Sequence, residues 1–232
     1  MTAPLILVPG TLCDERVFAP MIALMKPGAR STPPIVHGRV EAAAEALLAT
    51  APDRFIAGGF SLGGFVVLEL LRRAPERLAG AVLIASNAFP LGEDQAPARR
   101  GEVDFARRSG PGALIQALWP RYVVVRNQEN AMLRQLVTDM AEAVGVDTFA
   151  RQADLAVTRP DSCAIVRETP VPLLMLCGAE DAMCPPGRCS GMTGPTTTLK
   201  VLPGVGHFIP LEAPREAASA IEAWVQEVAP CC

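Results

Sequence analysis

Short runs of apolar residues alternate along the chain with longer stretches in which apolar residues recur every three or four positions. The apolar runs lie at residues 4–8, 54–58, 81–85, 171–177 and 198–202, and residues 65–71 begin a helix-like stretch. Continuous short runs of this kind are typical of strands that are covered on both faces of a parallel sheet. The alternation predicts an α/β fold, with a mostly parallel sheet flanked by helices.

Residues 31–38 are the weak point of this pattern, because Pro33 and Pro34 interrupt a region in which a further strand belongs. Proline cannot donate a hydrogen bond to a central ladder, so we expect a short or distorted strand there. The given sequence has no segment before the first strand that would add a hairpin. We therefore expect about six strands, a usual number for a sheet.

The longest gap between predicted strands follows residues 81–85 and has about 85 residues, far more than a crossover needs. Apolar spacing within it predicts helices near 96–108, 111–118, 130–144 and 147–156. We interpret about 89–167 as a helical lid. It is inserted into a single domain, 1–232, whose core comprises 1–88 and 168–232.

The composition fits a compact enzyme. The 232 residues are 50% hydrophobic and 19% charged, enough to bury a substantial core, and the net charge of −3 offers no basic patch for nucleic acid. The apolar stretch through Val8 is too short for a signal sequence or a membrane span. We expect a cytoplasmic protein with neither nucleic-acid nor membrane partners.

Residues 59–63 read Gly-Phe-Ser-Leu-Gly and lie between an apolar run and a helix-like run. In this strand-to-helix context the G-x-S-x-G pattern is typical of a nucleophile elbow, which holds a serine in a strained conformation above the sheet. Small residues at 59 and 63 permit the turn, because a β-carbon there would collide with the facing chain. The alternative is that Ser61 only caps the following helix.

A serine nucleophile needs a general base and an acid that orients the base. Of the 2 histidines, His207 follows the run at 198–202 in a glycine-rich loop, whereas we expect His37 on the surface and assign it no role. The acid should lie between serine and histidine along the chain. Asp181, after the run at 171–177, meets this requirement, and Glu180 is its rival.

Acyl transfer also needs donors for the oxyanion of the tetrahedral intermediate. The backbone amide of Leu62 is one candidate. The turn after the first strand, at Pro9-Gly10, should supply the second, for which we favour the amide of Thr11 and keep Leu12 as the alternative.

From Pro9-Gly10 to residues 206–212, these motifs resemble the α/β-hydrolase superfamily. Stretches at 9–14, 74–78 and 140–145 resemble an uncharacterised bacterial subgroup of hydrolases. The resemblance implies a serine hydrolase with a Ser-Asp-His triad. Many members have His-Gly in place of Pro9-Gly10. Dehalogenases and epoxide hydrolases of this fold carry aspartate where this chain has Ser61, which argues against those two activities.

Leu12, Trp119 and Tyr122 are the candidates for a substrate pocket. We interpret the arginine pairs at 99–100 and 107–108 as a solvated face, with a grip on a substrate carboxylate or phosphate as the alternative.

The 7 cysteines are an odd number, which argues against a disulfide framework. Cys177, Cys184 and Cys189 lack C-x-x-C spacing, so we interpret them as inert thiols rather than metal ligands. Cys13, near the oxyanion turn, is a candidate for modification by thiol reagents.

We predict a serine hydrolase that cleaves small carboxylic ester or thioester substrates through an acyl-enzyme on Ser61, without a metal or organic cofactor. Its partner would be a small acyl compound. The sequence leaves open whether the protein forms a homo-oligomer through the lid or the outer sheet edge. Two alternatives stay open as well. One is a carbon–carbon bond hydrolase or lyase that uses the same three residues, and the other is a non-catalytic binding protein of the same fold.

Overall fold

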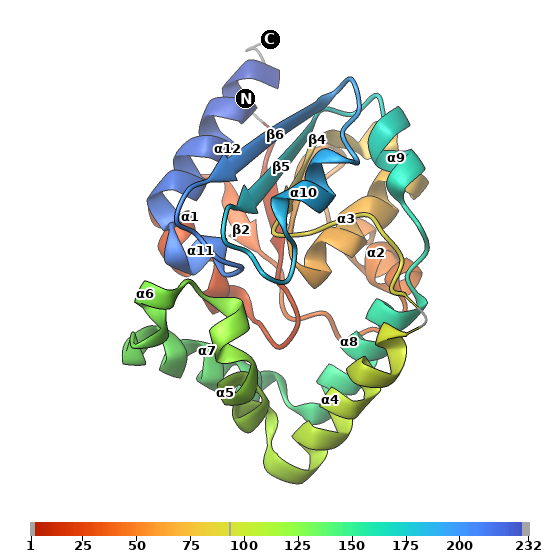
Figure 1. Ribbon diagram of the computed structural model, residues 1–232. Coiled ribbons are helices and arrows are strands. Elements are labelled where there is room, and N and C mark those ends of the chain that lie inside the picture. The colour runs from red at the N-terminus through yellow and green to blue at the C-terminus, as the bar shows by residue number, and fades with distance from the viewer. Residues whose placement is uncertain (1–2, 93, 229–232) are drawn as a thin grey trace.

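Six parallel strands form one sheet in the computed structural model, which describes residues 3–92 and 94–228 (Figure 1). The strands are β1 (Leu5–Val8), β2 (Ala29–Ser31), β3 (Phe55–Phe60), β4 (Leu78–Ile84), β5 (Leu173–Gly178) and β6 (Thr197–Leu202). Their order is β2-β1-β3-β4-β5-β6, and every neighbouring pair is parallel. The predicted fold class and strand number are confirmed. The order places the carboxyl ends of β1, β3, β4, β5 and β6 along one edge of the sheet.

The weak strand is as short as expected but lies earlier than the sequence pattern placed it. β2 has 3 residues, pairs with Leu5–Leu7 at the edge of the sheet, and ends at Ser31. Pro33 and Pro34 follow outside the strand. Because proline has no amide hydrogen for the ladder, the strand ends before these two residues instead of passing through them.

Alternate residues of each central strand belong to separate hydrophobic cores on the two faces of the sheet. In β1, Leu5 and Leu7 pack in one core and Ile6 and Val8 in the other. Successive side chains of a strand point to opposite faces, so a strand covered on both sides has to be apolar throughout. This is the physical reason for the continuous apolar runs in the sequence.

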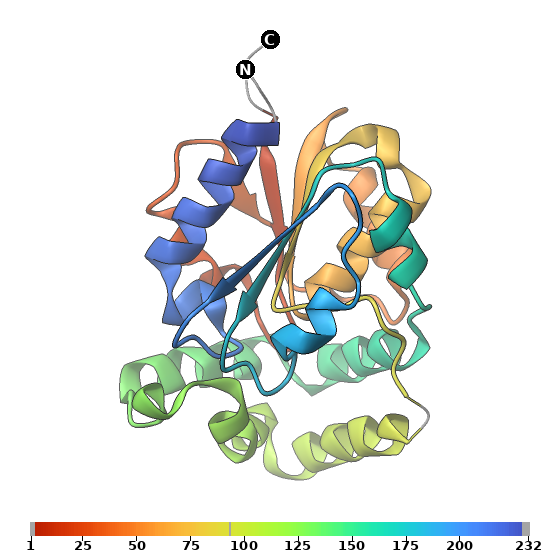
Figure 2. The ribbon, with the colours of Figure 1, turned by 45° about the horizontal axis from the view of Figure 1, so that its top comes forward.

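Helices cover both faces of the sheet (Figure 2). The face of the Leu5 core is covered by α1 (Ala19–Ile22), α11 (Ile209–Glu212) and α12 (Pro214–Val228). The opposite face is covered by α2 (Val40–Leu48), α3 (Leu62–Arg73), α9 (Cys163–Glu168) and α10 (Pro186–Ser190). Two short 3-10 helices, Glu15–Val17 and Pro75–Arg77, complete the flanking layers.

Of the six described helices between β4 and β5, all but α9 lie across the carboxyl ends of the strands (Figure 2). They are α4 (Gln95–Ser109), α5 (Pro111–Tyr122), α6 (Val125–Gln128), α7 (Ala131–Val144) and α8 (Val146–Thr158). Four of the five match predicted helices, and α6 was not predicted. α5 continues through Pro120, beyond its predicted end at 118. None of the described helices combines the length and apolar character needed to cross a membrane.

Candidate active site

Ser61 occupies the sharp turn between β3 and α3. Its backbone has φ 50° and ψ −112°, a conformation that costs a non-glycine residue about 1–3 kcal/mol. A β-carbon at Gly59 would collide with the backbone of Gly63, and one at Gly63 would collide with the carbonyl of Val8. The Ser61 side chain makes no capping hydrogen bond to α3. The turn therefore presents the hydroxyl at the edge of the sheet, and the capping alternative has no support in the geometry.

His207 and Asp181 meet Ser61 at this edge from the loops after β6 and β5. The Nε2 atom of His207 lies 3.0 Å from the Ser61 Oγ, and its Nδ1 lies 2.8 Å from Asp181 Oδ2. Asp181 is buried, and its Oδ1 also accepts hydrogen bonds from the amides of Met183 and Cys184, both at 2.8 Å. Glu180, the rival acid, is exposed. The structure thus brings the three predicted side chains together in one hydrogen-bonded line.

The buried carboxylate sets the protonation of the imidazole. Burial lowers the pKa of His207, but the negative charge and the hydrogen bond of Asp181 act in the opposite direction, with smaller contributions from Cys184 and Glu212. The net pKa of His207 lies above its usual value of 6.5. An imidazole with a raised pKa is a stronger base for the Ser61 proton, and it becomes protonated at a higher pH.

The helical insertion holds the His207 loop in place. The His207 amide donates to the carbonyl of Tyr122 at 3.0 Å, and the two rings stack with centroids 6.1 Å apart. Two residues further, the Val124 amide donates to Glu212 at 3.0 Å. Burial raises the pKa of Tyr122 to about 12, so its phenol stays neutral beside the imidazole. The end of α5 and the histidine loop therefore form one unit.

Two backbone amides are available for an oxyanion beside Ser61. Leu62 is the first residue of α3, and the amides in the first turn of a helix have no acceptor within the helix. The Leu12 amide instead donates to Gln152 Oε1 at 2.9 Å, which removes the Leu12 alternative. Thr11 and Leu62 both line the cavity that contains Ser61. Thr11 and Leu62 therefore stay the two candidates for the oxyanion site.

Gln152 is a residue that the sequence did not single out. It is completely buried on α8, and it bridges two loops, because its Oε1 accepts from the Leu12 amide and its Nε2 donates to the Ile35 carbonyl at 3.0 Å. Leu12 has a positive φ of 53°, so its conformation depends on such support. Gln152 therefore fixes the turn that carries the Thr11 amide.

We expect the Gln152→Met variant to lose both stability and activity. Each buried group left without a partner costs about 1–3 kcal/mol, which a thermal melt would register. If the Thr11 amide then leaves its position, kcat falls by up to about 100-fold, the loss typical of one missing oxyanion donor. Gln135→Met, the same change at an exposed position of α7, is the control. Unchanged kcat in a destabilised Gln152→Met protein would show that the turn does not need this support.

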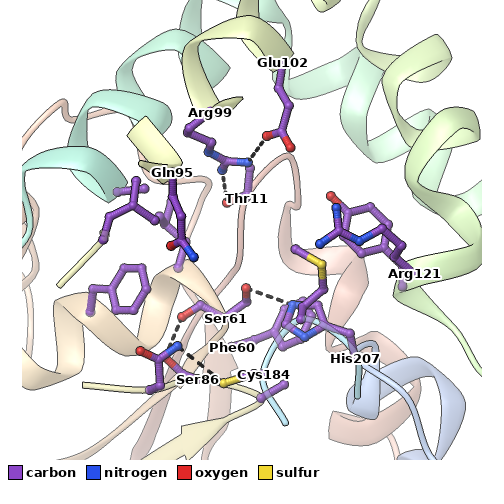
Figure 3. A pocket seen from close by; sticks show the side chains of 18 of the residues that line it. Thr11, Phe60, Ser61, Ser86, Gln95, Arg99, Glu102, Arg121, Cys184 and His207 are labelled. Carbon is purple, nitrogen blue, oxygen red and sulfur yellow. Dashed lines mark hydrogen bonds and ion pairs between the residues drawn. The ribbon is translucent and has the colours of Figure 1, made fainter. Parts of the chain in front are cut away.

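A cavity of about 320 Å³ opens in front of Ser61, between the sheet edge and the helical insertion (Figure 3). Tyr122 lines it as predicted, but Leu12 and Trp119 do not. Leu12 packs in the hydrophobic core, and Trp119 is buried with its indole N–H donating to the Gln128 carbonyl at 3.1 Å. Both predictions were wrong because the sequence shows that a side chain is apolar without showing which buried space it fills.

The position of Arg99 shows that the interpretation of both arginine pairs as a solvated face was wrong for this residue. Its guanidinium lies in the cavity wall, where it donates to Thr11 Oγ1 at 3.0 Å and pairs with Glu102 at 2.7 Å (Figure 3). Arg107 and Arg108 are exposed, as expected. One arginine of the predicted surface therefore belongs to the candidate site.

The cysteines offer neither a metal site nor an accessible thiol near the turn. The described residues include no cluster of histidine, cysteine and carboxylate side chains that could hold a metal ion. Cys13 is buried, and burial raises the pKa of its thiol far above the usual value, so modification by thiol reagents is no longer expected. Cys184 lines the cavity, and its pKa is also raised, by a hydrogen bond with Cys189 and by burial.

A sequence profile of the alpha/beta hydrolase family matches residues 7–220, nearly the whole chain. The chain belongs to the alpha/beta hydrolase family. The hydrolase is 26% identical over 249 residues to the biotin biosynthesis bifunctional protein BioHC of Cellvibrio japonicus, a match that covers 99% of the chain and 49% of that protein. The chain thus spans about half the length of that relative.

Two further relatives are described as esterases. The hydrolase is 26% identical over 246 residues to the pimeloyl-[acyl-carrier protein] methyl ester esterase of Aromatoleum aromaticum, with 94% of the chain and 96% of that protein covered. It also superposes on a thermophilic esterase from Thermogutta terrifontis with a TM-score of 0.87 and 27% identity, over 97% of the chain and 90% of that structure. The predicted membership of the alpha/beta hydrolases is thereby confirmed, and these two relatives are described as esterases.

Proposed function

We propose that this hydrolase cleaves small carboxylic ester or thioester substrates through an acyl-enzyme on Ser61. The observation that carries the proposal is the continuous line from Ser61 Oγ through the His207 imidazole to Asp181, with separations of 3.0 and 2.8 Å. A carboxylate beside Nδ1 keeps the proton on that nitrogen and leaves the Nε2 lone pair directed at the serine hydroxyl. This is the tautomer that a general base needs.

In the first half of the reaction, Ser61 Oγ attacks the substrate carbonyl while His207 Nε2 accepts the hydroxyl proton. The new oxyanion is bound by the amides of Thr11 and Leu62. The imidazolium, stabilised by Asp181, then gives its proton to the departing alcohol or thiol, and the acyl-enzyme remains.

In the second half, His207 takes a proton from water as the water attacks the acyl carbonyl. The same two amides bind the second oxyanion, and the proton returns to Ser61 Oγ as the carboxylic acid leaves. The reaction consumes one water and needs no metal or organic cofactor.

The cavity supports a small substrate. Its volume of about 320 Å³ lies near the lower end of the range for ligand pockets. The Aromatoleum and Thermogutta relatives are esterases by description, which favours ester hydrolysis over the carbon–carbon bond alternative.

Labelling with a fluorophosphonate tests the proposal directly, because this reagent forms a covalent bond with an activated serine. Intact-protein mass spectrometry should show one adduct on the wild type and none on Ser61→Ala. Ser190→Ala, the same change at an exposed serine of α10, should label like the wild type. The absence of an adduct on the wild type, or its persistence on Ser61→Ala, would remove Ser61 as the nucleophile.

A further inference from the structure

The cavity in front of Ser61 has an unbalanced charge. Among the described residues, its wall includes one carboxylate, Glu102, and four arginines, namely Arg99, Arg121, Arg159 and Arg188. Asp181 lies behind His207 and is not part of this wall. The chain as a whole has a net charge of −3, so the positive charge is a local property of the cavity. A cleft lined by one sign of charge attracts ligands of the opposite sign.

Arg99 is the one arginine of this group whose charge is balanced within the cavity. It pairs with Glu102 and donates to Thr11 Oγ1, so its guanidinium is occupied by the oxyanion turn. Figure 3 shows this pair on one side of the space in front of Ser61 and Arg121 on another. The remaining three arginines are therefore the cations available to a ligand.

Arg159, just after α8, is held by neutral groups. Its guanidinium donates to the carbonyls of Phe89 and Ala156 and lies 4.2 Å from the centre of the Phe65 ring. Among the described residues, no carboxylate forms an ion pair with it. Burial, together with the positive charges of Arg99 and Arg188, lowers the pKa of Arg159 to about 10. The protein thus fixes a cation in the wall without supplying a matching anion from the described chain.

Arg188 and Arg121 extend this charge to the rim. Both are exposed, and the described residues contain no ion-pair partner for either. The Arg188 guanidinium, in α10, lies 5.1 Å from the centre of the Phe89 ring. The carbonyl of the same residue, Phe89, accepts the hydrogen bond from Arg159. Phe89 therefore contacts both arginines, Arg159 through its carbonyl and Arg188 through its ring.

We propose that Arg159 and Arg188, assisted by Arg121, bind an anionic group of the substrate, a carboxylate or a phosphate, at a distance from the carbonyl that Ser61 attacks. The guanidinium group matches both anions, because its planar set of donors fits two oxygens at once. The inference rests on the proposed function and narrows it to esters or thioesters that carry a second, negatively charged group.

Matched substrate pairs test this preference and distinguish the two anions. The carboxylate pair is monomethyl adipate and dimethyl adipate, and the phosphate pair is acetyl-coenzyme A and S-acetyl-N-acetylcysteamine. We expect the charged member of one pair to have the higher kcat/KM by about tenfold, the effect of a hydrogen bond to a charged group. Added salt should reduce the preference, because the rim arginines are exposed to solvent.

The double variant Arg121→Gln/Arg188→Gln should lower kcat/KM for the charged member of the preferred pair by about tenfold, and lower kcat/KM for the neutral member far less. Arg108→Gln, at an exposed position of α4 outside the cavity, should change neither. Arg159→Lys, which keeps the charge but loses the planar fork, should retain part of the preference. Equal losses for charged and neutral substrates in the double variant would overturn the proposal.

Binding without turnover separates this inference from the proposed function. Calorimetry on Ser61→Ala with adipate and with inorganic phosphate should show one of the two anions binding, and the Arg121→Gln/Arg188→Gln changes should weaken that binding about tenfold. If neither anion binds, or if the double variant binds equally well, the anion site is excluded. If an anion binds but no ester or thioester is hydrolysed, the proposed function fails and the anion site stands.

Discussion

The Ser61→Ala variant is expected to lose about 10⁶-fold in kcat on p-nitrophenyl acetate, the loss typical of removing the nucleophile from a catalytic triad. Without the Oγ atom no acyl-enzyme forms, and His207 has only water to activate, at a position that the elbow did not arrange for it. The oxyanion amides and the cavity persist, so a small rate above that of the uncatalysed reaction should remain.

This result needs evidence that the variant is folded. Alanine at position 61 can adopt the same strained backbone as serine, and its N–H still donates a hydrogen bond to the Ile84 carbonyl, at 2.9 Å in the wild type. Circular dichroism and the melting temperature should therefore change little. Ser190→Ala should hydrolyse the ester at the wild-type rate. A folded Ser61→Ala protein that keeps most of its activity would show that another group performs the chemistry.

The Asp181→Asn variant is expected to lose about 10⁴-fold in kcat, the effect of an amide in place of the triad carboxylate. An asparagine side chain can donate to Nδ1, which moves the imidazole proton to Nε2 and makes that atom a donor to Ser61 instead of an acceptor. Its oxygen still accepts from the Met183 and Cys184 amides, so the loop itself should persist. Glu180→Gln, the change at the neighbouring exposed acid, should stay near the wild-type rate.

The pH profile provides a second measurement on the same variant. In the wild type, kcat/KM should fall with decreasing pH around a pKa above 6.5, because Asp181 raises the pKa of His207 and protonated imidazole is no base. When the carboxylate is removed, burial dominates and lowers the His207 pKa, so the acidic limb of the residual activity should move to lower pH. A profile that stays flat well below pH 6.5, or an acidic limb that does not move in Asp181→Asn, would contradict the assignment of His207 as the base.

The helix content of the insertion could be predicted from sequence, but its packing could not. Apolar spacing placed α4, α5, α7 and α8 within a few residues of their bounds, since each helix buries one side. Trp119 was a pocket candidate, but its ring is buried in the insertion and its indole N–H donates a hydrogen bond to the Gln128 carbonyl. Periodicity identifies the buried side of a helix, whereas the identity of the neighbour depends on how the helices cross.

The arginines in the cavity wall could not be predicted from the sequence either. Arg99 was assigned to a solvated face from its neighbours in sequence, and Arg159 and Arg188 were not singled out at all. They come from α4, from the residue after α8 and from α10, segments that are far apart along the chain. No local pattern relates them, because each is an ordinary arginine at the end or on the surface of a helix.

The sequence by itself determined the parallel sheet, the elbow at Ser61 and the order of the serine, the acid and the histidine. These features are local, because a buried strand needs an unbroken apolar run and a sharp turn needs glycine where a β-carbon would collide. Only the tertiary structure decided that the Leu12 amide donates to Gln152, that Thr11 lines the cavity and that four arginines converge there. Such contacts join residues that are distant along the chain, and their formation depends on how the insertion packs across the sheet edge.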